Sequence, residues 1–225
     1  MSSVNEWMAR EYLEALGFLV RQPRKYQVVA RSKGLHEEVD LLAVNPAVSP
    51  GGSLPKARQW GAAELAQVGC AIVAVRGWHS EKFTAAMLAS SPEIYRFAEP
   101  ESVRAAEAEL GLVNPAKILC MADLPTDPDP RAEALAFLKS RGIDGVILFR
   151  PMLLELVERI DVKKTYEKSD LLQILRILKN YDLLKSGQMD LFAQARRRKA
   201  VAQAPGQMDE LLPAEGPQDG GPAGV

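Results

Sequence analysis

Three acidic side chains near the N-terminus have the types and spacing of residues that could hold a metal ion. Glu6 lies in a segment with helical periodicity, and Glu38 and Asp40 open an apolar run, EEVDLLAVN, that predicts a β-strand. Metal-dependent phosphodiester hydrolysis needs clustered carboxylates to bind Mg²⁺, together with a positive group near the attacking water or the scissile phosphate. A helix followed by paired strands can supply such carboxylates, so these residues are the first candidates for a catalytic site.

The same region resembles the PD-(D/E)XK nuclease superfamily, and within it the branch that is like Holliday-junction resolvases. The resemblance covers about residues 5–90. It rests on the segments FLVRQ and EVDLL and on the pattern E-x-x-A-x-x-Y-L-x-x-x-G, formed by Glu6, Ala9, Tyr12, Leu13 and Gly17. It implies a restriction-endonuclease-like mixed sheet flanked by helices and Mg²⁺ as the cofactor of an active site. It further implies that Glu6 and Asp40 are metal ligands and that Glu38 is an auxiliary acid.

The family pattern closes with a strand that ends in E-x-K, and here this chain departs from it. The corresponding strand is AIVAVRGWH (71–79), in which Ala74 stands at the acid position and Arg76 at the lysine position. Alanine offers no metal ligand. Arginine keeps a positive charge, but it does not give up its proton, and its planar fork contacts phosphate differently from an ammonium group. We therefore predict a site that lacks one metal-binding carboxylate.

Three interpretations of this departure stay open. The missing acid could be replaced from a neighbouring element, by Glu64 or by Glu81 together with Lys82. The domain could instead be a degenerate nuclease that binds DNA or a protein without cutting, which is the interpretation we favour. The match could also be a generic amphipathic helix followed by a strand. Asp40 argues against this last interpretation, because a carboxylate inside an apolar strand needs a partner.

Basic residues surround this half-site in the sequence. In the family, the segment between the first strands borders the DNA, so the resemblance makes several of these residues candidate phosphate contacts. They are Arg21, Arg24, Lys25, Arg31 and Lys33. His79 is a weaker candidate, because a lone histidine beside a helix start is more often a hydrogen-bonded cap residue. His36, which precedes the acidic strand, is an equally weak candidate.

A second motif lies near the C-terminus and resembles the bacterial peptide that binds the DNA sliding clamp, Gln-Leu-(Ser/Asp)-Leu-Phe. It is formed by Gln188, Met189, Asp190, Leu191 and Phe192. A glutamine amide can bond at one end of a groove while a leucine and a phenylalanine fill an apolar pocket. The alternative is that these apolar residues only pack the end of the preceding helix onto the domain.

Alternating strand and helix patterns predict an α/β fold over residues 1–150. We expect helices at 4–16, 61–67, 80–110 and 130–141, strands at 18–21, 27–30, 37–45, 71–76, 117–121 and 145–149, and a turn-rich insertion at 46–60. Residues 151–186 predict a C-terminal helical extension, 187–199 the clamp-binding-like basic peptide, and 200–225 a disordered tail.

Composition limits the function classes. With 47% hydrophobic and 25% charged residues and no long apolar segment, the chain predicts a soluble cytoplasmic protein that does not bind membranes. Its two cysteines lie in apolar runs, which predicts reduced core residues. The leading hypothesis is a DNA-associated protein of bacterial repair, recombination or defence. The alternatives are an active Mg²⁺-dependent DNA endonuclease, and a structural subunit that forms a homodimer or a protein complex through residues 151–184.

Overall fold

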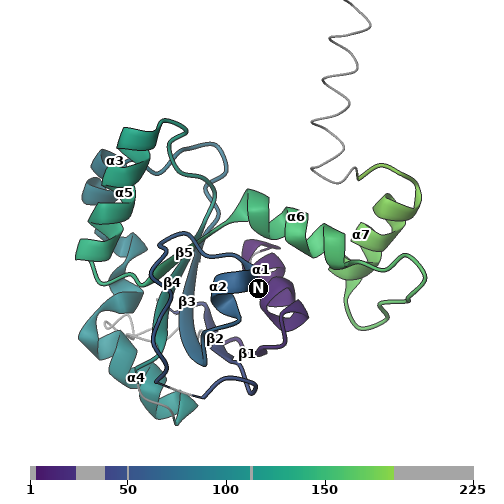
Figure 1. Cartoon of the computed structure of the whole chain (residues 1–225), viewed down its shortest axis with the longest axis horizontal. Coiled ribbons are helices and arrows are strands. Elements are labelled where there is room, and N and C mark those ends of the chain that lie inside the picture. Colours follow the sequence, from purple (N-terminus) through teal and green to yellow (C-terminus); the bar gives the residue numbers. More distant parts are fainter. Residues whose placement is uncertain (1–3, 24–38, 50, 112–113, 185–225) are drawn as a thin grey trace, which may run out of the picture. The chain divides into compact units, whose positions relative to one another are not determined.

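The computed structural model describes residues 4–23, 39–49, 51–111 and 114–184. Its centre is an open, mixed sheet of five strands in the order β1-β2-β3-β4-β5 (Figure 1). The strands are β1 (Leu19–Arg21), β2 (Leu41–Val44), β3 (Cys70–Arg76), β4 (Ala116–Met121) and β5 (Gly145–Leu148). Strands β1, β2 and β3 pair antiparallel, whereas β3, β4 and β5 pair parallel. The predicted α/β class and mixed sheet are therefore confirmed.

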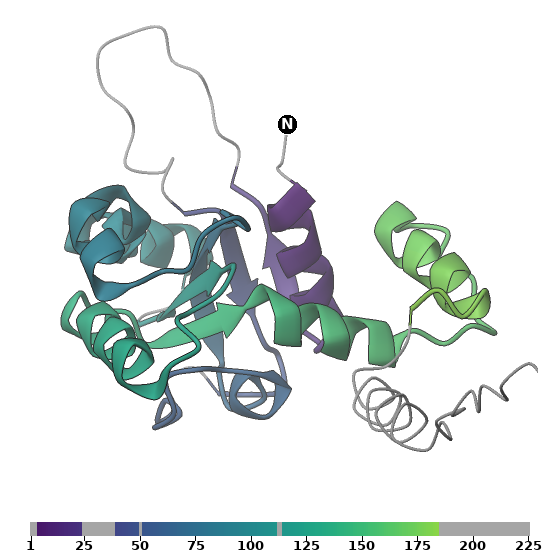
Figure 2. The ribbon, with the colours of Figure 1, turned by 90° about the horizontal axis from the view of Figure 1, so that it is seen from above.

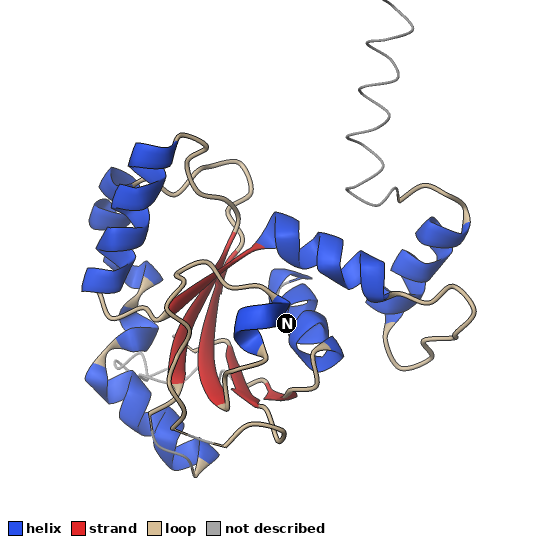
Figure 3. Cartoon of the chain, viewed as in Figure 1, coloured by secondary structure: helices blue, strands red, loops and turns tan. Residues whose placement is uncertain are grey.

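Helices cover both faces of this sheet (Figure 3). One layer contains α1 (Val4–Ala15), α2 (Ala62–Leu65) and α6 (Phe149–Arg159). The other contains α3 (Ala85–Ser90), η2 (Pro92–Ile94), η3 (Arg96–Ala98), α4 (Pro100–Leu110) and α5 (Pro128–Ser140). Side chains alternate along β3, so that Ala71, Val73 and Val75 join the first core and Ile72 and Ala74 join the second. Both faces of β3 are buried, which explains its continuous apolar sequence.

Helix α6 belongs to the core of the domain. It starts at Phe149, directly after β5, so the boundary predicted at 150–151 falls within its first turn. Pro151 is tolerated there because the first turn of a helix needs no internal N–H donor. Phe149, Met152 and Leu156 are buried in the first core, and α6 packs against α1 (Figure 2).

Helix α7 (Asp170–Asn180) follows, and its N-cap is Ser169, whose side chain accepts a hydrogen bond from the Leu172 N–H. The described residues up to 184 belong to one compact unit, Met1–Ser186. Among the helices described, none is both long enough and apolar enough to cross a membrane.

Part of the turn-rich insertion covers the edge of the sheet. The Val146 N–H donates to the Arg58 carbonyl and the Trp60 N–H donates to the Val146 carbonyl, both at 2.8 Å. The Trp60 indole packs so closely on Gly145 that a Cβ there would overlap its ring. This short segment satisfies backbone groups that an edge strand otherwise leaves open.

Candidate functional site

The site predicted from the sequence lies at one end of the sheet, where the start of β2 meets the end of β3. Leu41 is paired with Val73, and the Asp40 N–H donates to the Val73 carbonyl at 3.0 Å. Continuing this antiparallel register by one residue places Asp40 opposite Ala74. The position at which the family pattern expects a second acid is therefore directly across from Asp40, and it carries a methyl group.

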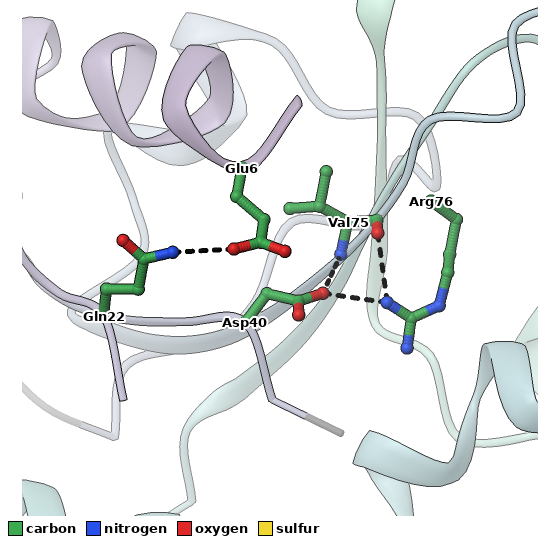
Figure 4. Close-up of polar contacts among 5 residues, drawn as sticks. All are labelled: Glu6, Gln22, Asp40, Val75 and Arg76. Carbon is green, nitrogen blue, oxygen red and sulfur yellow. Dashed lines mark hydrogen bonds and ion pairs between the residues drawn. The ribbon is translucent and has the colours of Figure 1, made fainter. Parts of the chain in front are cut away.

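Asp40 is buried and held by two donors from β3. Its side chain is only 3% exposed. Its Oδ2 atom accepts a hydrogen bond from the Val75 N–H at 2.7 Å and from Arg76 Nη1 at 2.8 Å (Figure 4). A buried carboxylate is tolerated when it is paired and hydrogen-bonded, and both conditions are met here. The expectation that Asp40 needs a partner is confirmed, and that partner is Arg76.

Arg76 also contacts the backbone of its own strand. Its Nη1 atom donates to the Val75 carbonyl at 3.0 Å, and its side chain is 15% exposed. The same nitrogen thus lies against two oxygen atoms, one from Asp40 and one from Val75. The guanidinium is oriented by the strand that carries it as well as by the facing carboxylate.

Glu6 reaches this end of the sheet from the other side. It lies in the first turn of α1, and Figure 4 shows its side chain extending from the helix toward the strand ends at which Asp40 lies. Its Oε2 atom accepts a hydrogen bond from Gln22 Nε2 at 2.6 Å. The structure therefore brings Glu6, Asp40 and Arg76 to one region, as the family resemblance implies.

A second polar group adjoins the site at the loop after β3. Asn5 Oδ1 lies 3.0 Å from His79 Nε2, and Asn5 Nδ2 donates to the Gly77 carbonyl at 3.5 Å. The imidazole ring of His79 also meets the ring of Phe149 edge-on, with 4.8 Å between centroids. A Cβ at Gly77 would overlap the Asn5 amide, so this amide could not keep its position beside a larger residue.

Of the candidates for a relocated acid, Glu64 precedes β3, whereas Glu81 and Lys82 follow it. Glu64 accepts a hydrogen bond from the Gly61 N–H at the start of α2, before β3 begins. Because β3 has seven residues, its two ends are about 20 Å apart. Glu81 lies in the loop after β3, and the ammonium group of Lys82 donates to the Thr126 hydroxyl. Glu64 therefore lies at the opposite end of the strand from Asp40.

Only one of the predicted phosphate contacts falls within the described residues. Arg21 is 66% exposed and forms an ion pair with Glu109 of α4 at 2.9 Å. The remaining predicted residues lie outside the described part of the chain: Arg24, Lys25, Arg31, Lys33, His36, Glu38 and the peptide Gln188, Met189, Asp190, Leu191 and Phe192. Their roles stay predictions.

Sequence reasoning did not identify Gln22 and Asn5 as members of the site. Gln22 directly follows the strand LVR, and Asn5 directly precedes Glu6. Their position next to motif residues in the sequence was therefore the one signal that could have identified them as site residues. Amides are common on protein surfaces, however, and nothing in the local sequence predicts that one would bond Glu6 and the other His79.

The described residues do not fit a Mg²⁺ site. Within the part of the chain that the structure describes, no three His, Cys, Asp or Glu side chains gather in a way that could hold a metal ion. Asp40 Oδ2 is engaged by two donors, and Ala74 offers no ligand. Mg²⁺ remains an implication of the resemblance, and what the described geometry provides is an ion pair beside a second carboxylate.

Comparison of this chain with known protein families, with curated proteins and with solved structures gave no match.

Proposed function

We propose that the chain is a nuclease-like protein of bacterial DNA repair, recombination or defence that acts by binding DNA or a partner and does not cleave DNA. One observation carries the proposal. Glu6, Asp40 and Arg76 meet at one end of a mixed sheet, while the position facing Asp40 is occupied by Ala74. The arrangement has the residue types of a nuclease site and lacks one of its acids.

The order of elements supports a restriction-endonuclease-like fold. A helix, α1, precedes an antiparallel group of three strands, and β4 then adds in parallel to β3. The carboxylates come from the helix and from the start of the central strand pair, which are the two elements that the sequence resemblance names. Fold alone does not determine function, so the proposed function is inferred from the site residues.

The chemistry of the site favours binding over cleavage. Hydrolysis of a phosphodiester through a metal needs several oxygen ligands in one place, and the described site offers two carboxylates, one of them engaged by Arg76. A guanidinium group has N–H donors and no acceptor, so Arg76 is not a base for an attacking water. It can contribute positive charge to a phosphate-binding surface.

Nuclease activity is tested by incubating the purified protein with branched and linear DNA in Mg²⁺ or Mn²⁺. We expect no cleavage. Cleavage that Asp40→Ala abolishes would instead support the alternative of an active Mg²⁺-dependent endonuclease, with an acid recruited from outside the described residues.

DNA binding is tested by fluorescence anisotropy over a range of salt concentrations. Because each phosphate contact releases condensed counterions, replacing Lys25 and Arg31 by alanine should weaken binding and reduce the slope of log K against log salt by about 0.9 per lost contact. The matched control is Lys163→Ala with Lys164→Ala, two basic residues in the loop between α6 and α7. Equal losses for both pairs would show that only overall charge matters.

The C-terminal peptide supports recruitment to a bacterial sliding clamp as part of the same proposal. A peptide comprising residues 186–194 should bind the clamp, and Leu191→Ala with Phe192→Ala should abolish binding, because these two side chains would fill the apolar pocket. Gln207, Met208 and Asp209 repeat the first three residues of the motif without its Leu-Phe pair. A peptide around them is the matched control, and binding of both peptides alike would contradict the assignment.

A structural subunit that assembles through α7 is the second candidate function. The inner face of α7 packs on the first core through Leu172 and Leu175, while Ile174, Ile177 and Tyr181 form an apolar stripe that is 43–70% exposed. A second copy of the chain would bury this stripe. Light scattering should then report a dimer that Ile177→Glu dissociates and Asn180→Glu does not. A monomer at all concentrations would exclude a homodimer through this face.

A further inference from the structure

Two oxygen atoms of different origin converge on one nitrogen at the end of β3. Asp40 Oδ2 lies 2.8 Å from Arg76 Nη1, and the Val75 carbonyl oxygen lies 3.0 Å from the same atom (Figure 4). A carboxylate oxygen and a backbone carbonyl oxygen are the donor types that hard divalent cations bind. The geometry is therefore that of a cation-binding position, and a side chain of the protein supplies the cation.

The position is shielded from solvent, so its charge balance matters. The side chains of Asp40 and Arg76 are 3% and 15% exposed. Removing a carboxylate from water is unfavourable unless a positive group lies beside it. The Arg76 guanidinium provides that charge at 2.8 Å from Asp40 Oδ2. In this site the compensating charge is covalently attached and needs no ion from solution.

We infer that Arg76 Nη1 occupies a cation seat formed by Asp40 and the Val75 carbonyl, so that a built-in guanidinium takes the place of a divalent metal ion. The site of the wild-type protein should accordingly bind neither Mg²⁺ nor Mn²⁺. Removing the guanidinium should open the seat to a divalent cation. This inference concerns the charge that balances Asp40, and it can be tested without DNA.

The experiment measures Mn²⁺ binding to the full-length protein by the loss of the free-ion electron paramagnetic resonance signal. Arg76→Met keeps the apolar stem and removes the charge, so it should bind one Mn²⁺ per chain, at least tenfold more tightly than the wild type. Asp40→Asn in the Arg76→Met background should abolish this binding. Arg76→Lys retains a cation near Asp40 and should resemble the wild type.

Two results would overturn the inference. One is a folded Arg76→Met variant, verified by its circular dichroism melt, that binds no Mn²⁺. The other is Mn²⁺ binding by the wild-type protein that Asp40→Asn removes, which would show that the seat accepts a metal while Arg76 is present. This second measurement needs only the wild type and a conservative variant, so it remains decisive if Arg76→Met does not fold. A failure of the DNA-binding proposal would leave both results unchanged.

Discussion

Asp40 and Glu155 are two shielded carboxylates in different regions of the domain, and each is satisfied by different chemistry. Asp40 is paired with a guanidinium and a backbone N–H at the end of the sheet. Glu155 of α6 accepts hydrogen bonds from the Tyr12 hydroxyl at 2.5 Å and from the Ala62 N–H at 3.2 Å, both neutral donors. Glu155 thereby joins three helices that cover one face of the sheet.

The two carboxylates also act on different buried acids. Burial, together with the hydrogen bond to Glu155 and its charge, raises the pKa of Tyr12 above its ordinary range. Burial, with a smaller contribution from the charge of Asp40, raises the pKa of the Cys120 thiol. The contribution of Glu155 to the pKa of Tyr12 comes mainly from a hydrogen bond. The contribution of Asp40 to the pKa of Cys120 comes from its charge. Glu155 thus connects helices through neutral donors, whereas Asp40 forms a buried charge pair at the candidate site.

The largest effect is expected from Asp40→Ala. This change leaves the Arg76 guanidinium and the Val75 N–H without their acceptor, so we expect the free energy of unfolding to fall by about 3 kcal/mol in urea denaturation. Asp144→Ala is the matched control: it removes the 3.1 Å ion pair with Lys117 and the hydrogen bond from the Lys117 N–H at 2.8 Å, at a more exposed position, and should cost about 1 kcal/mol. Equal losses would show that burial of Asp40 adds nothing.

A smaller loss is expected from Glu155→Ala. The Tyr12 hydroxyl and the Ala62 N–H would both lose their acceptor, which should lower the free energy of unfolding by about 2 kcal/mol. Glu158, one turn further along α6, is exposed, and its replacement by alanine should change stability by less than about 0.5 kcal/mol. DNA binding by the Glu155→Ala variant should remain at the wild-type level, whereas Arg76→Ala should weaken it. If both variants bind equally, the distinction between the two regions fails.

Tyr12→Phe removes the hydrogen bond from Tyr12 to Glu155 and leaves the one from Ala62 in place. The change preserves the buried ring and removes only the hydroxyl, so Glu155 keeps the Ala62 N–H as a donor. We expect a loss of about 1 kcal/mol, measured by the same denaturation, because a typical net hydrogen bond contributes that much. Combining Tyr12→Phe with Glu155→Ala should cost less than the sum of the single losses, because both changes remove the same bond.

The five described strands could be predicted from the sequence because they depend on local patterns, whereas the strand predicted at 27–30 lies outside the described residues. Apolar runs marked β3, β4 and β5, and the family motif pointed to Glu6 and Asp40. What the sequence did not predict depends on contacts between distant segments. Residues 58–60 have the composition of a loop, yet they pair with β5 because an open strand edge needs partners. The contact of Glu6 with Gln22 likewise depends on how α1 lies over β1.

The smallest and most gradual effect is expected at alkaline pH. Because the pKa of Tyr12 is raised in the folded protein, its phenol stays protonated when the unfolded chain has begun to lose that proton. The unfolded state then binds fewer protons than the folded one, so this contribution is complete below pH 10 and is lost as the pH rises further. The Cys120 thiol acts with the same sign from about pH 9. Each group should reduce stability by at most about 1.4 kcal/mol per pH unit.

Urea denaturation between pH 8 and 11 measures this decline in stability. Tyr12→Phe should make the decline shallower above pH 10, and Cys120→Ala should do so from about pH 9, because each removes one titrating group. The Cys70 thiol, whose pKa is also raised by burial, would still titrate in both variants. An unchanged slope in Tyr12→Phe would mean that the phenol loses its proton equally in both states. Burial and the contact with Glu155 would then not keep that proton in place, which would contradict the role given to Glu155 in joining the helices.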